Sequence, residues 1–421
     1  MMRKLLTVIY LAAVLLLGGC GAPAQAEAPV VSPSPAAVPT ASPTADPEEA
    51  AREAARQEAI RAAGRLADQG LFDDALTLLA DPSLEGGSTD SAAAEIRSRQ
   101  EALVPYEGEL RHIFFHSLIV YPEMVFTDLE TPMGGYNSGF AEKAELERIL
   151  PQLYERGYVL YDLAECFGRG EDGKMCRKEI LLPPGKTPLI LSVDDVAYAY
   201  GPGWARRLFV DGNGELFYEV PNPSGGIDIA CDGDVMGVVD AFVEEHPDFA
   251  WHGHKGTIAL TGFQGAFGYP SYDTEENGRQ IRAVADALKA DGWNFASHSY
   301  THNNGSYGFW GTGCVPEKIR YDISKWVDRV TPWIGETNLF IAPFGVRVRG
   351  QALQYVLDAG FDIYCTVDDH VVNELHDDYA LMSRIEIGGY SMREFTDILN
   401  ELFFNVDEVF DAQGRPPLGP D

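Results

Sequence analysis

The chain has 421 residues, of which 45% are hydrophobic and 11% aromatic, and this composition suffices for a large core and one or two domains. Its 64 acidic and 32 basic residues give a formal net charge of −32. So acidic a surface repels phosphate backbones and anionic headgroups, which argues against nucleic acid as a partner and against electrostatic membrane binding. We expect a neutral or cationic ligand.

The first residues predict export. Arg3 and Lys4 precede an apolar run from Leu5 to Leu17 that is too short to span a bilayer comfortably, and small residues follow it. The stretch "LLLGGC" resembles a bacterial lipoprotein signal, which implies that residues 1–19 are removed and that Cys20 is lipidated. The protein would then be anchored to the cell membrane on its extracytoplasmic side. The alternative is a plain secretory signal with a chance cysteine.

Two segments of different composition follow. Residues 20–47 are mainly Ala, Pro, Ser, Thr and Val, which cannot form a core and predict an extended tether. In residues 48–104 the apolar side chains recur at helical spacing, which predicts a first helix ending at Gly70, a second from Phe72 to Leu79 and a third from Ser91 to Leu103. We interpret this segment as a helical spacer packed on the main domain. A tetratricopeptide-like hairpin is the alternative.

From about residue 109, apolar runs alternate with amphipathic helices. The runs are continuous, as in buried parallel strands, and they read "HIFFHSLIVY", "GYVLYDL", "TPLILSVDDV", "GTIALTGF", "WNFASHS", "NLFIAPFG", "FDIYCTV" and "YALMSRIEI". The expected helices cover residues 141–156, 233–245, 277–291, 316–334 and 350–359. This order predicts an α/β fold, either a barrel or a doubly wound sheet. In both architectures the active site lies at the carboxyl ends of the strands.

Polar residues follow these strands. In chain order they are His116, Asp194, Asp195, His298, His302, Pro343–Gly345, Asp368 and Asp369. Adjacent carboxylates such as Asp194 and Asp195 repel each other, and a divalent cation would offset that cost. The sequence therefore favours a cation at this edge of the fold.

The pattern predicts a metal held by one carboxylate and two imidazoles. Three protein ligands leave a position for water, as in catalytic sites. The spacing of four places His298 and His302 on one face of a helical turn, and Asp195 would complete the set. Asp194 could then accept a proton as water attacks a carbonyl group, which is metal-assisted hydrolysis. A polar turn without a ligand is the alternative for the two histidines.

Three stretches, "LSVDDV", "SHSYTH" and "APFG", resemble the signatures of the polysaccharide deacetylases, the NodB homology domain of carbohydrate esterase family 4. The resemblance covers residues 109–411 and implies a distorted (β/α) barrel of about seven strands. It also implies removal of N-acetyl groups from an amino-sugar polymer by a bound divalent metal, with zinc expected and cobalt or nickel as alternatives. It assigns Asp194 as the base, Asp195, His298 and His302 as ligands, and the Phe344 N–H as an oxyanion donor.

Two positions depart from that family's pattern. The arginine expected two residues before Pro343 is replaced by Ile341, and no "Leu-x-x-His" strand closes the chain. The stretch "LMSRIEIGGYS" is instead similar to the last strand of a permuted branch that includes poly-N-acetylglucosamine deacetylases. There the histidine-bearing strand comes first, which makes His116 the candidate general acid. A buried core histidine is the alternative for His116, and we expect the nearby His112 to be exposed.

Several further residues have two candidate roles in this scheme. Arg347 and Arg349 could supply the missing positive charge, or face solvent. Tyr272, Tyr300 and Pro343 are candidate substrate-binding residues, although the aromatic side chains near the barrel mouth could equally pack beneath the loops. An exported protein permits disulfides, and the cysteines suggest a Cys166–Cys176 bridge, a weaker Cys231–Cys314 pair and a buried thiol at Cys365.

These observations predict a membrane-tethered, metal-dependent hydrolase that removes N-acetyl groups from a cell-wall or extracellular glycan. An O-acetyl ester deacetylase is the enzymatic alternative, because the same attack by water would cleave either bond. A catalytically impaired glycan-binding or scaffold lipoprotein is the alternative from another class.

Overall fold

The computed structural model describes residues 47–84, 86–198 and 201–419. The predicted signal peptide, the lipidation site Cys20 and nearly all of the tether lie outside the described residues. Within them, no helix is both long enough and apolar enough to cross a membrane.

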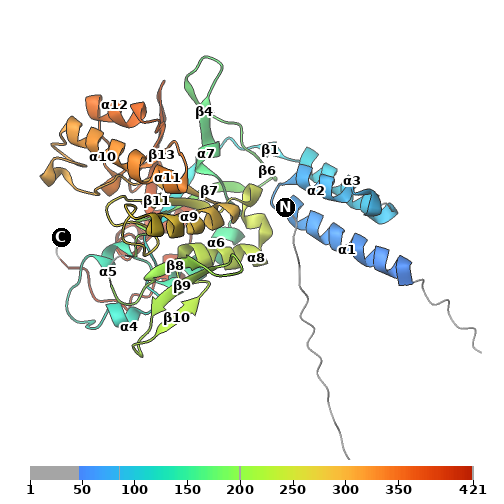
Figure 1. Cartoon of the computed structure of the whole chain (residues 1–421), viewed down its shortest axis with the longest axis horizontal. Helices are drawn as coiled ribbons and strands as arrows, with labels where there is room; N and C mark the ends of the chain where they lie inside the picture. The colour runs from blue at the N-terminus through green and yellow to red at the C-terminus, as the bar shows by residue number, and fades with distance from the viewer. Residues whose placement is uncertain (1–46, 85, 199–200, 420–421) are drawn as a thin grey trace, which may run out of the picture. The chain divides into compact units, whose positions relative to one another are not determined.

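Three helices come first in the described chain, as the helical spacing predicts (Figure 1). They are α1 (Pro47–Asp68), α2 (Phe72–Leu79) and α3 (Gly87–Glu101). The α1 side chains Ala59, Ala63 and Ala67 are buried in one hydrophobic cluster with Trp251. Gly70 turns the chain between α1 and α2 at φ +77°, and a Cβ there would lie 2.7 Å from the Trp251 ring. Glycine at this position therefore allows both the turn and the close packing.

The predicted strands form a closed barrel, which confirms the (β/α) barrel prediction and excludes an open doubly wound sheet. Its seven parallel strands run in the order β11, β12, β13, β14, β16, β2, β7 and back to β11. Their bounds are β2 (Arg111–Phe115), β7 (Thr187–Asp194), β11 (Gly256–Leu260), β12 (Trp293–Ser297), β13 (Leu339–Ile341), β14 (Ile363–Val367) and β16 (Ala380–Glu386). The remaining predicted strand, β3 (Tyr158–Leu160), pairs with the first residues of β7. The first barrel strand thus lies between the last one, β16, and β7.

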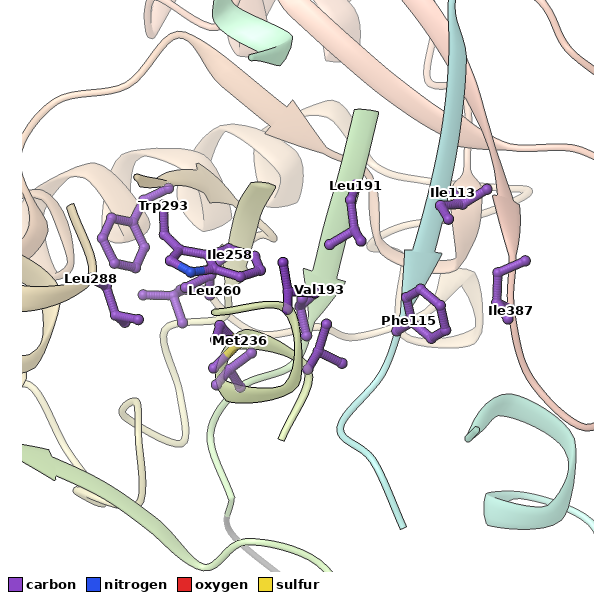
Figure 2. Close-up of a cluster of buried hydrophobic side chains, with 14 of the residues drawn as sticks. Ile113, Phe115, Leu191, Val193, Met236, Ile258, Leu260, Leu288, Trp293 and Ile387 are labelled. Carbon is purple, nitrogen blue, oxygen red and sulfur yellow. The ribbon is translucent and has the colours of Figure 1, made fainter. Parts of the chain in front are cut away.

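Helices cover the outside of the barrel, at the positions that the sequence pattern predicts. They are α6 (Lys143–Glu155), α8 (Val235–Glu245), α9 (Glu275–Ala290), α10 (Pro316–Arg329), α11 (Thr331–Ile334) and α12 (Gly350–Asp358). Local signals set several helix starts: the Thr274 side chain accepts a hydrogen bond from the N–H of Asn277, and Pro316 occupies the first turn of α10. Figure 2 shows strand residues such as Leu191 and Val193 packed with helical residues such as Met236.

The remaining elements are short. The strands are β1 (Val104–Pro105), β4 (Phe167–Arg169), β5 (Met175–Arg177), β6 (Leu181–Leu182), β8 (Arg207–Val210), β9 (Leu216–Pro221), β10 (Ile227–Ala230) and β15 (Asn373–Leu375). The helices are α4 (Pro122–Val125), α5 (Tyr136–Gly139), α7 (Leu163–Cys166), α13 (Ser391–Glu394), α14 (Thr396–Leu402) and α15 (Val406–Val409). Strands β8, β9 and β10 come between β7 and α8 in the chain and form a separate antiparallel sheet, which was not predicted from the sequence.

Alternation along the strands directs one set of side chains into the barrel. On β7, Leu189, Leu191 and Val193 belong to the cluster shared with the helices, so Ser192 and Asp194 face the other way. His112 on β2 faces Ser192, with 2.9 Å between its Nε2 and the serine Oγ, and is 2% exposed. The expectation that His112 is exposed was therefore wrong, because a strand places it on the same face as His116, four residues later.

The described cysteines are all free thiols, so the predicted Cys166–Cys176 and Cys231–Cys314 bridges are absent from the described residues. In the β4–β5 hairpin Cys176 pairs with Gly168, which makes Cys166 its diagonal neighbour. Diagonal neighbours are about 7–8 Å apart, whereas a disulfide needs Cα atoms within about 4.4–6.8 Å of each other. The prediction of Cys365 as a buried thiol is confirmed.

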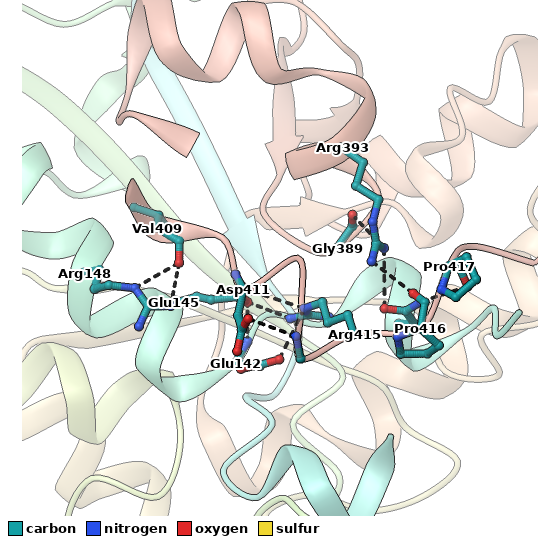
Figure 3. A network of polar contacts seen from close by, with 12 residues as sticks. Glu142, Glu145, Arg148, Gly389, Arg393, Val409, Asp411, Arg415, Pro416 and Pro417 are labelled. Carbon is teal, nitrogen blue, oxygen red and sulfur yellow. Dashed lines mark hydrogen bonds and ion pairs between the residues drawn. The ribbon is translucent and has the colours of Figure 1, made fainter. Parts of the chain in front are cut away.

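A buried ionic network ties the end of the chain to α6 (Figure 3). The Arg415 guanidinium donates to both carboxylate oxygens of Glu145, at 3.2 and 2.6 Å, and lies 3.3 Å from Glu142. Glu142 and Glu145 also form a capping box at the start of α6. One guanidinium thus faces two buried carboxylates. Burial, and then the negative charge of Glu145, raise the pKa of Glu142 to about 7.

This raised pKa predicts a pH-dependent cost to stability. Glu142 has an ordinary pKa of 4.5, so the folded protein holds its proton up to a higher pH than the unfolded chain does. Below pH 4.5 Glu142 is protonated in both states and costs nothing. As pH rises from 4.5 to about 7, the shift of this group lowers the free energy of unfolding by about 3 kcal/mol. Urea unfolding at several pH values should show Glu142→Gln gaining on the wild type across this window. A difference that stays constant with pH would contradict the prediction.

Candidate active site

The loops at the carboxyl ends of β7, β12 and β13 hold several residues in the left-handed backbone region. Asp195, Ser299, His302 and Phe344 have φ values of 59°, 65°, 49° and 57°. Non-glycine residues rarely adopt this conformation, and such residues concentrate at functional sites. His298 and His302 lie on this irregular backbone and not on a helical turn, so that part of the prediction was wrong. Their rings nevertheless lie side by side, with centroids 4.9 Å apart.

The structure brings Asp195, His298 and His302 together as a candidate metal-binding group. One Asp195 oxygen lies 4.0 Å from His298 Nε2, and the other lies 3.9 Å from His302 Nε2. Ligand atoms that are each about 2.0–2.2 Å from a shared ion are at most about 4.4 Å apart. Both separations are within that limit.

The state of His298 also suits a metal ligand. Its Nδ1 lies 2.7 Å from the Ile341 carbonyl oxygen, which can only accept, so Nδ1 carries the proton and Nε2 presents its lone pair to the site. Burial lowers the pKa of His298, and the nearby Asp194 and Asp195 carboxylates only partly oppose this. The imidazole is therefore neutral at pH 7. A carboxylate and two imidazoles form a donor set that suits zinc and similar divalent metals.

Asp194 lies at the end of β7 and is buried against Arg384 of β16. The two guanidinium nitrogens donate to the two carboxylate oxygens at 2.8 and 2.9 Å, and one also donates to Ser192 at 3.1 Å. The guanidinium lies over the Phe114 ring, 3.9 Å from its centroid. Burial alone would raise the pKa of Asp194, but Arg384 and then His298 outweigh it and hold the value at about 2. Asp194 is therefore ionised and fixed in orientation, as a general base must be.

Arg384 gives Asp194 the guanidinium partner that the motif resemblance leads one to expect at position 341, where this chain has Ile341. No role was predicted for Arg384 from the stretch "LMSRIEIGGYS". The two arginines considered there do not reach Asp194: Arg347 makes a two-pronged ion pair with Glu374, and Arg349 is exposed. A signal was nevertheless present in the sequence, because an arginine inside the apolar run "ALMSRIEI" requires a buried carboxylate partner.

His116 follows β2 and lines a cavity together with Asp195, one member of the candidate metal group. The cavity has a volume of about 120 Å³, and its walls include His116, Asp195, Tyr136, Phe140 and Trp204. His116 lies close enough to Asp194 to contribute to its lowered pKa. On its other side, His116 Nδ1 is 3.5 Å from a carboxylate oxygen of Glu386. Burial raises the pKa of Glu386, and the attraction of His116 lowers it in part.

The remaining predicted site residues lie in different surroundings. Phe344 is 54% exposed and its ring packs 4.5 Å from that of His302, while Pro343 is buried. Tyr300 lies against Lys325, whose Nζ is 4.2 Å from the ring centroid. Tyr272 is only 4% exposed and donates to the Thr261 carbonyl, so it packs beneath the loops and the structure does not support a substrate contact.

Asp368 and Asp369 follow β14 and form a second acidic group with His370. Asp369 and His370 are exposed, and Asp368 is partly so. The three residues of the first group, Asp194 and His116 therefore form the candidate site, while the predicted strand-end carboxylates of β14 lie outside it.

Comparisons with known proteins give weak likenesses. No protein-family model matches the sequence, and no curated protein matches it. Among solved structures, the Streptococcus pyogenes deacetylase PplD, in complex with acetate, shows 12% identity and a TM-score of 0.40, covering 70% of this chain and 98% of its own. A de-N-acetylase from Aggregatibacter actinomycetemcomitans shows 12% identity and a TM-score of 0.40, covering 68% and 100%. IcaB from Ammonifex degensii shows 13% identity and a TM-score of 0.38, covering 67% and 93%.

These TM-scores are low. The fold therefore rests on the closed ring of strands described above, and the chemistry on the geometry of the site itself.

Proposed function

We propose that the protein is a metal-dependent hydrolase that removes N-acetyl groups from an amino-sugar polymer. The observation that carries this proposal is the convergence of an ionised, arginine-bound carboxylate, a three-residue metal-binding group and a histidine at one end of the barrel. The motif resemblance to polysaccharide deacetylases supports the N-acetyl glycan as substrate. Asp195, His298 and His302 would hold the metal, which when bound would polarise the acetyl carbonyl group and acidify water.

Three residues of the chain carry out the remaining steps. Asp194 accepts a proton from the water that attacks the acetyl carbon, and its pKa keeps it ionised to do so. The backbone N–H of Phe344 stabilises the negative charge that develops on the carbonyl oxygen. His116 donates a proton to the amide nitrogen as the carbon–nitrogen bond breaks. The products are acetate and a free amine on the sugar.

The alternative hypothesis, a glycan-binding or scaffold protein without catalytic activity, depended on the absence of the arginine at position 341 and of a terminal "Leu-x-x-His" strand. Arg384 supplies the guanidinium and His116 lines the cavity of the site, so no observation favours that reading. We also propose, from residues 1–20 alone, that the protein is exported and lipid-anchored at Cys20. The substrate would then be a cell-wall or extracellular glycan.

Acetate release from N-acetylglucosamine oligomers and from peptidoglycan tests the proposal. We expect metal-loaded wild-type protein to release acetate, and His116→Ala to lower kcat by about 10²–10⁴-fold, the usual contribution of a general acid. Metal content measured on both proteins should be equal, because His116 is not a ligand. If the metal-loaded wild type releases no acetate from any glycan, the proposed function is wrong.

A further inference from the structure

The orientation of His116 depends on the short helix α5. The His116 Nδ1 lies 2.9 Å from the carbonyl oxygen of Gly139, which only accepts, so Nδ1 carries a proton and Nε2 is the nitrogen left for proton transfer. The ring also stacks on Phe140, which follows α5, with centroids 5.3 Å apart and planes at 17°. The closest of the ring's contacts thus come from residues 139 and 140, and a carboxylate oxygen of Glu386 lies farther away, 3.5 Å from the same Nδ1.

This helix cannot hold itself in place. It has four residues, about one turn, and an isolated turn is unstable in water. Gly135 precedes it at φ 60° and provides no side-chain cap. The position of the Gly139 carbonyl must therefore be fixed by contacts with other parts of the chain.

One support is the turn after β16. A Cβ on Gly388 would lie 2.8 Å from the carbonyl carbon of Gly139, and one on Gly389 would lie 2.0 Å from the backbone carbonyl oxygen of Asn137. The two glycines thus bring this turn against the α5 backbone itself. The N–H of Tyr390 then donates to the carbonyl of Ser138 at 2.8 Å.

The other support is the end of the chain, which we call the C-terminal strap, residues 415–419. The fully buried Asn137 donates its amide hydrogens to the carbonyl oxygens of Pro416 and Pro417, at 2.7 and 3.3 Å. Backbone bonds join Met133 to the strap in both directions, from its N–H to Pro417 and from Gly419 to its carbonyl, at 3.0 and 3.1 Å.

The strap is itself anchored at two points. Arg393 donates to the Pro416 carbonyl at 3.0 Å, and Arg415 is buried between Glu142 and Glu145 (Figure 3). Its carbonyl groups are therefore fixed acceptors for Asn137. An unbroken chain of contacts runs from the buried ionic network through the strap and Asn137 to the Gly139 carbonyl.

We propose that the C-terminal strap and Asn137 are positioning elements for His116, which they hold in the orientation that transfers a proton to the leaving nitrogen. The inference rests on the proposed function, since it concerns the acid of that reaction. Asn137 contacts no reacting atom and acts through Gly139. A displacement of about 1 Å in such a group can cost about 10²-fold in rate.

Substrates with different leaving groups distinguish a misplaced general acid from a general loss of order in the active site. An amine leaves only after the acid has protonated it, whereas 4-nitrophenolate leaves from 4-nitrophenyl acetate without a proton. Both substrates need Asp194 and the metal-binding group. Only the glycan needs a correctly oriented His116.

The test compares kcat on N-acetylglucosamine oligomers with kcat on 4-nitrophenyl acetate. The variants are a chain that ends at Arg415 and, as a second way of breaking the same contacts, Asn137→Ala. We expect each to lower kcat on the oligomers about 10- to 100-fold and to leave 4-nitrophenyl acetate hydrolysis within about threefold, with the same metal content as the wild type. His116→Ala should show the same pattern more strongly.

Asn405→Ala is the matched control. Asn405 caps α15 in the same C-terminal region, where its side chain accepts from the N–H of Asp407 and donates to Glu408, and its N–H donates to Gln152. It should change neither rate. If both rates fall together in the strap variants, or if neither falls, the inference is wrong. If the wild type releases no acetate from the oligomers or any other glycan, the proposed function itself is wrong, and that result is visible before any variant is compared.

Discussion

Replacing Arg384 by methionine should nearly abolish glycan deacetylation and also destabilise the protein. Asp194 would remain buried at the end of β7 without its two-pronged partner. Removing one partner of a buried ion pair typically costs about 3–5 kcal/mol. With Arg384 gone, burial would raise the pKa of Asp194, so less of the base would be ionised. We expect kcat to fall at least about 100-fold at pH 7, and the acid limb of the pH–rate profile to move to higher pH.

Two further variants separate the charge of Arg384 from its geometry. Arg384→Lys keeps a positive charge but cannot bind both carboxylate oxygens in one plane, so its activity should lie between those of the wild type and Arg384→Met. Arg384→Met combined with Asp194→Asn leaves no unpaired charge, and its free energy of unfolding should recover toward the wild-type value although activity stays low. If Arg384→Met alone keeps both wild-type stability and wild-type kcat, Arg384 does not orient the base.

The barrel could be predicted from the sequence because its strands are long apolar runs and its helices are amphipathic. Buried parallel strands need apolar side chains on both faces, and this constraint is visible without a structure. The small antiparallel sheet β8–β10 was missed although a signal was present: the turn residues Asp211–Gly214 lie between the mainly apolar runs of β8 and β9.

The strand-end residues Asp194, Asp195, His298 and His302 could be placed together because parallel strands end at the same side of a barrel. Local geometry could not be predicted in the same way. The two histidines converge through left-handed residues, which their spacing of four does not reveal. Long-range partners were equally hidden: the contact between Arg384 and Asp194 joins residues 190 positions apart in the chain. Such contacts depend on the closure of the ring, in which β2 separates the two strands.

The role of Tyr272 could not be predicted from the sequence either. A tyrosine in a loop near the barrel mouth is compatible with sugar stacking and with packing beneath the loop, and both uses require the same amphipathic side chain. The structure buries Tyr272 and satisfies its hydroxyl group through the Thr261 carbonyl. The choice between the two uses depends on the loop path from residue 262 to residue 274, and turn-forming residues alone do not define that path.

The neighbouring aspartates Asp194 and Asp195 should give opposite results when each is changed to asparagine. Asp194 is buried and bound by Arg384, whereas Asp195 is partly exposed, has φ 59° and lies within reach of both histidines. Asp194→Asn should keep the metal, since Asp195, His298 and His302 remain, and should lose about 10²–10⁴-fold in kcat because an amide cannot accept the proton from water. Asp195→Asn should lose the metal, because a neutral amide is a much weaker ligand than a carboxylate.

Metal content by atomic emission and kcat on N-acetylglucosamine oligomers, measured on the same preparations, distinguish these results. The two substitutions are chemically identical and one residue apart, so each is the control for the other. Added metal should restore activity to Asp195→Asn in part, since two histidines still bind the ion, and should restore none to Asp194→Asn. If both variants kept the metal and lost activity equally, the two carboxylates would share one role. The division between a buried base and a partly exposed ligand would then be wrong, although the residues would still mark the site.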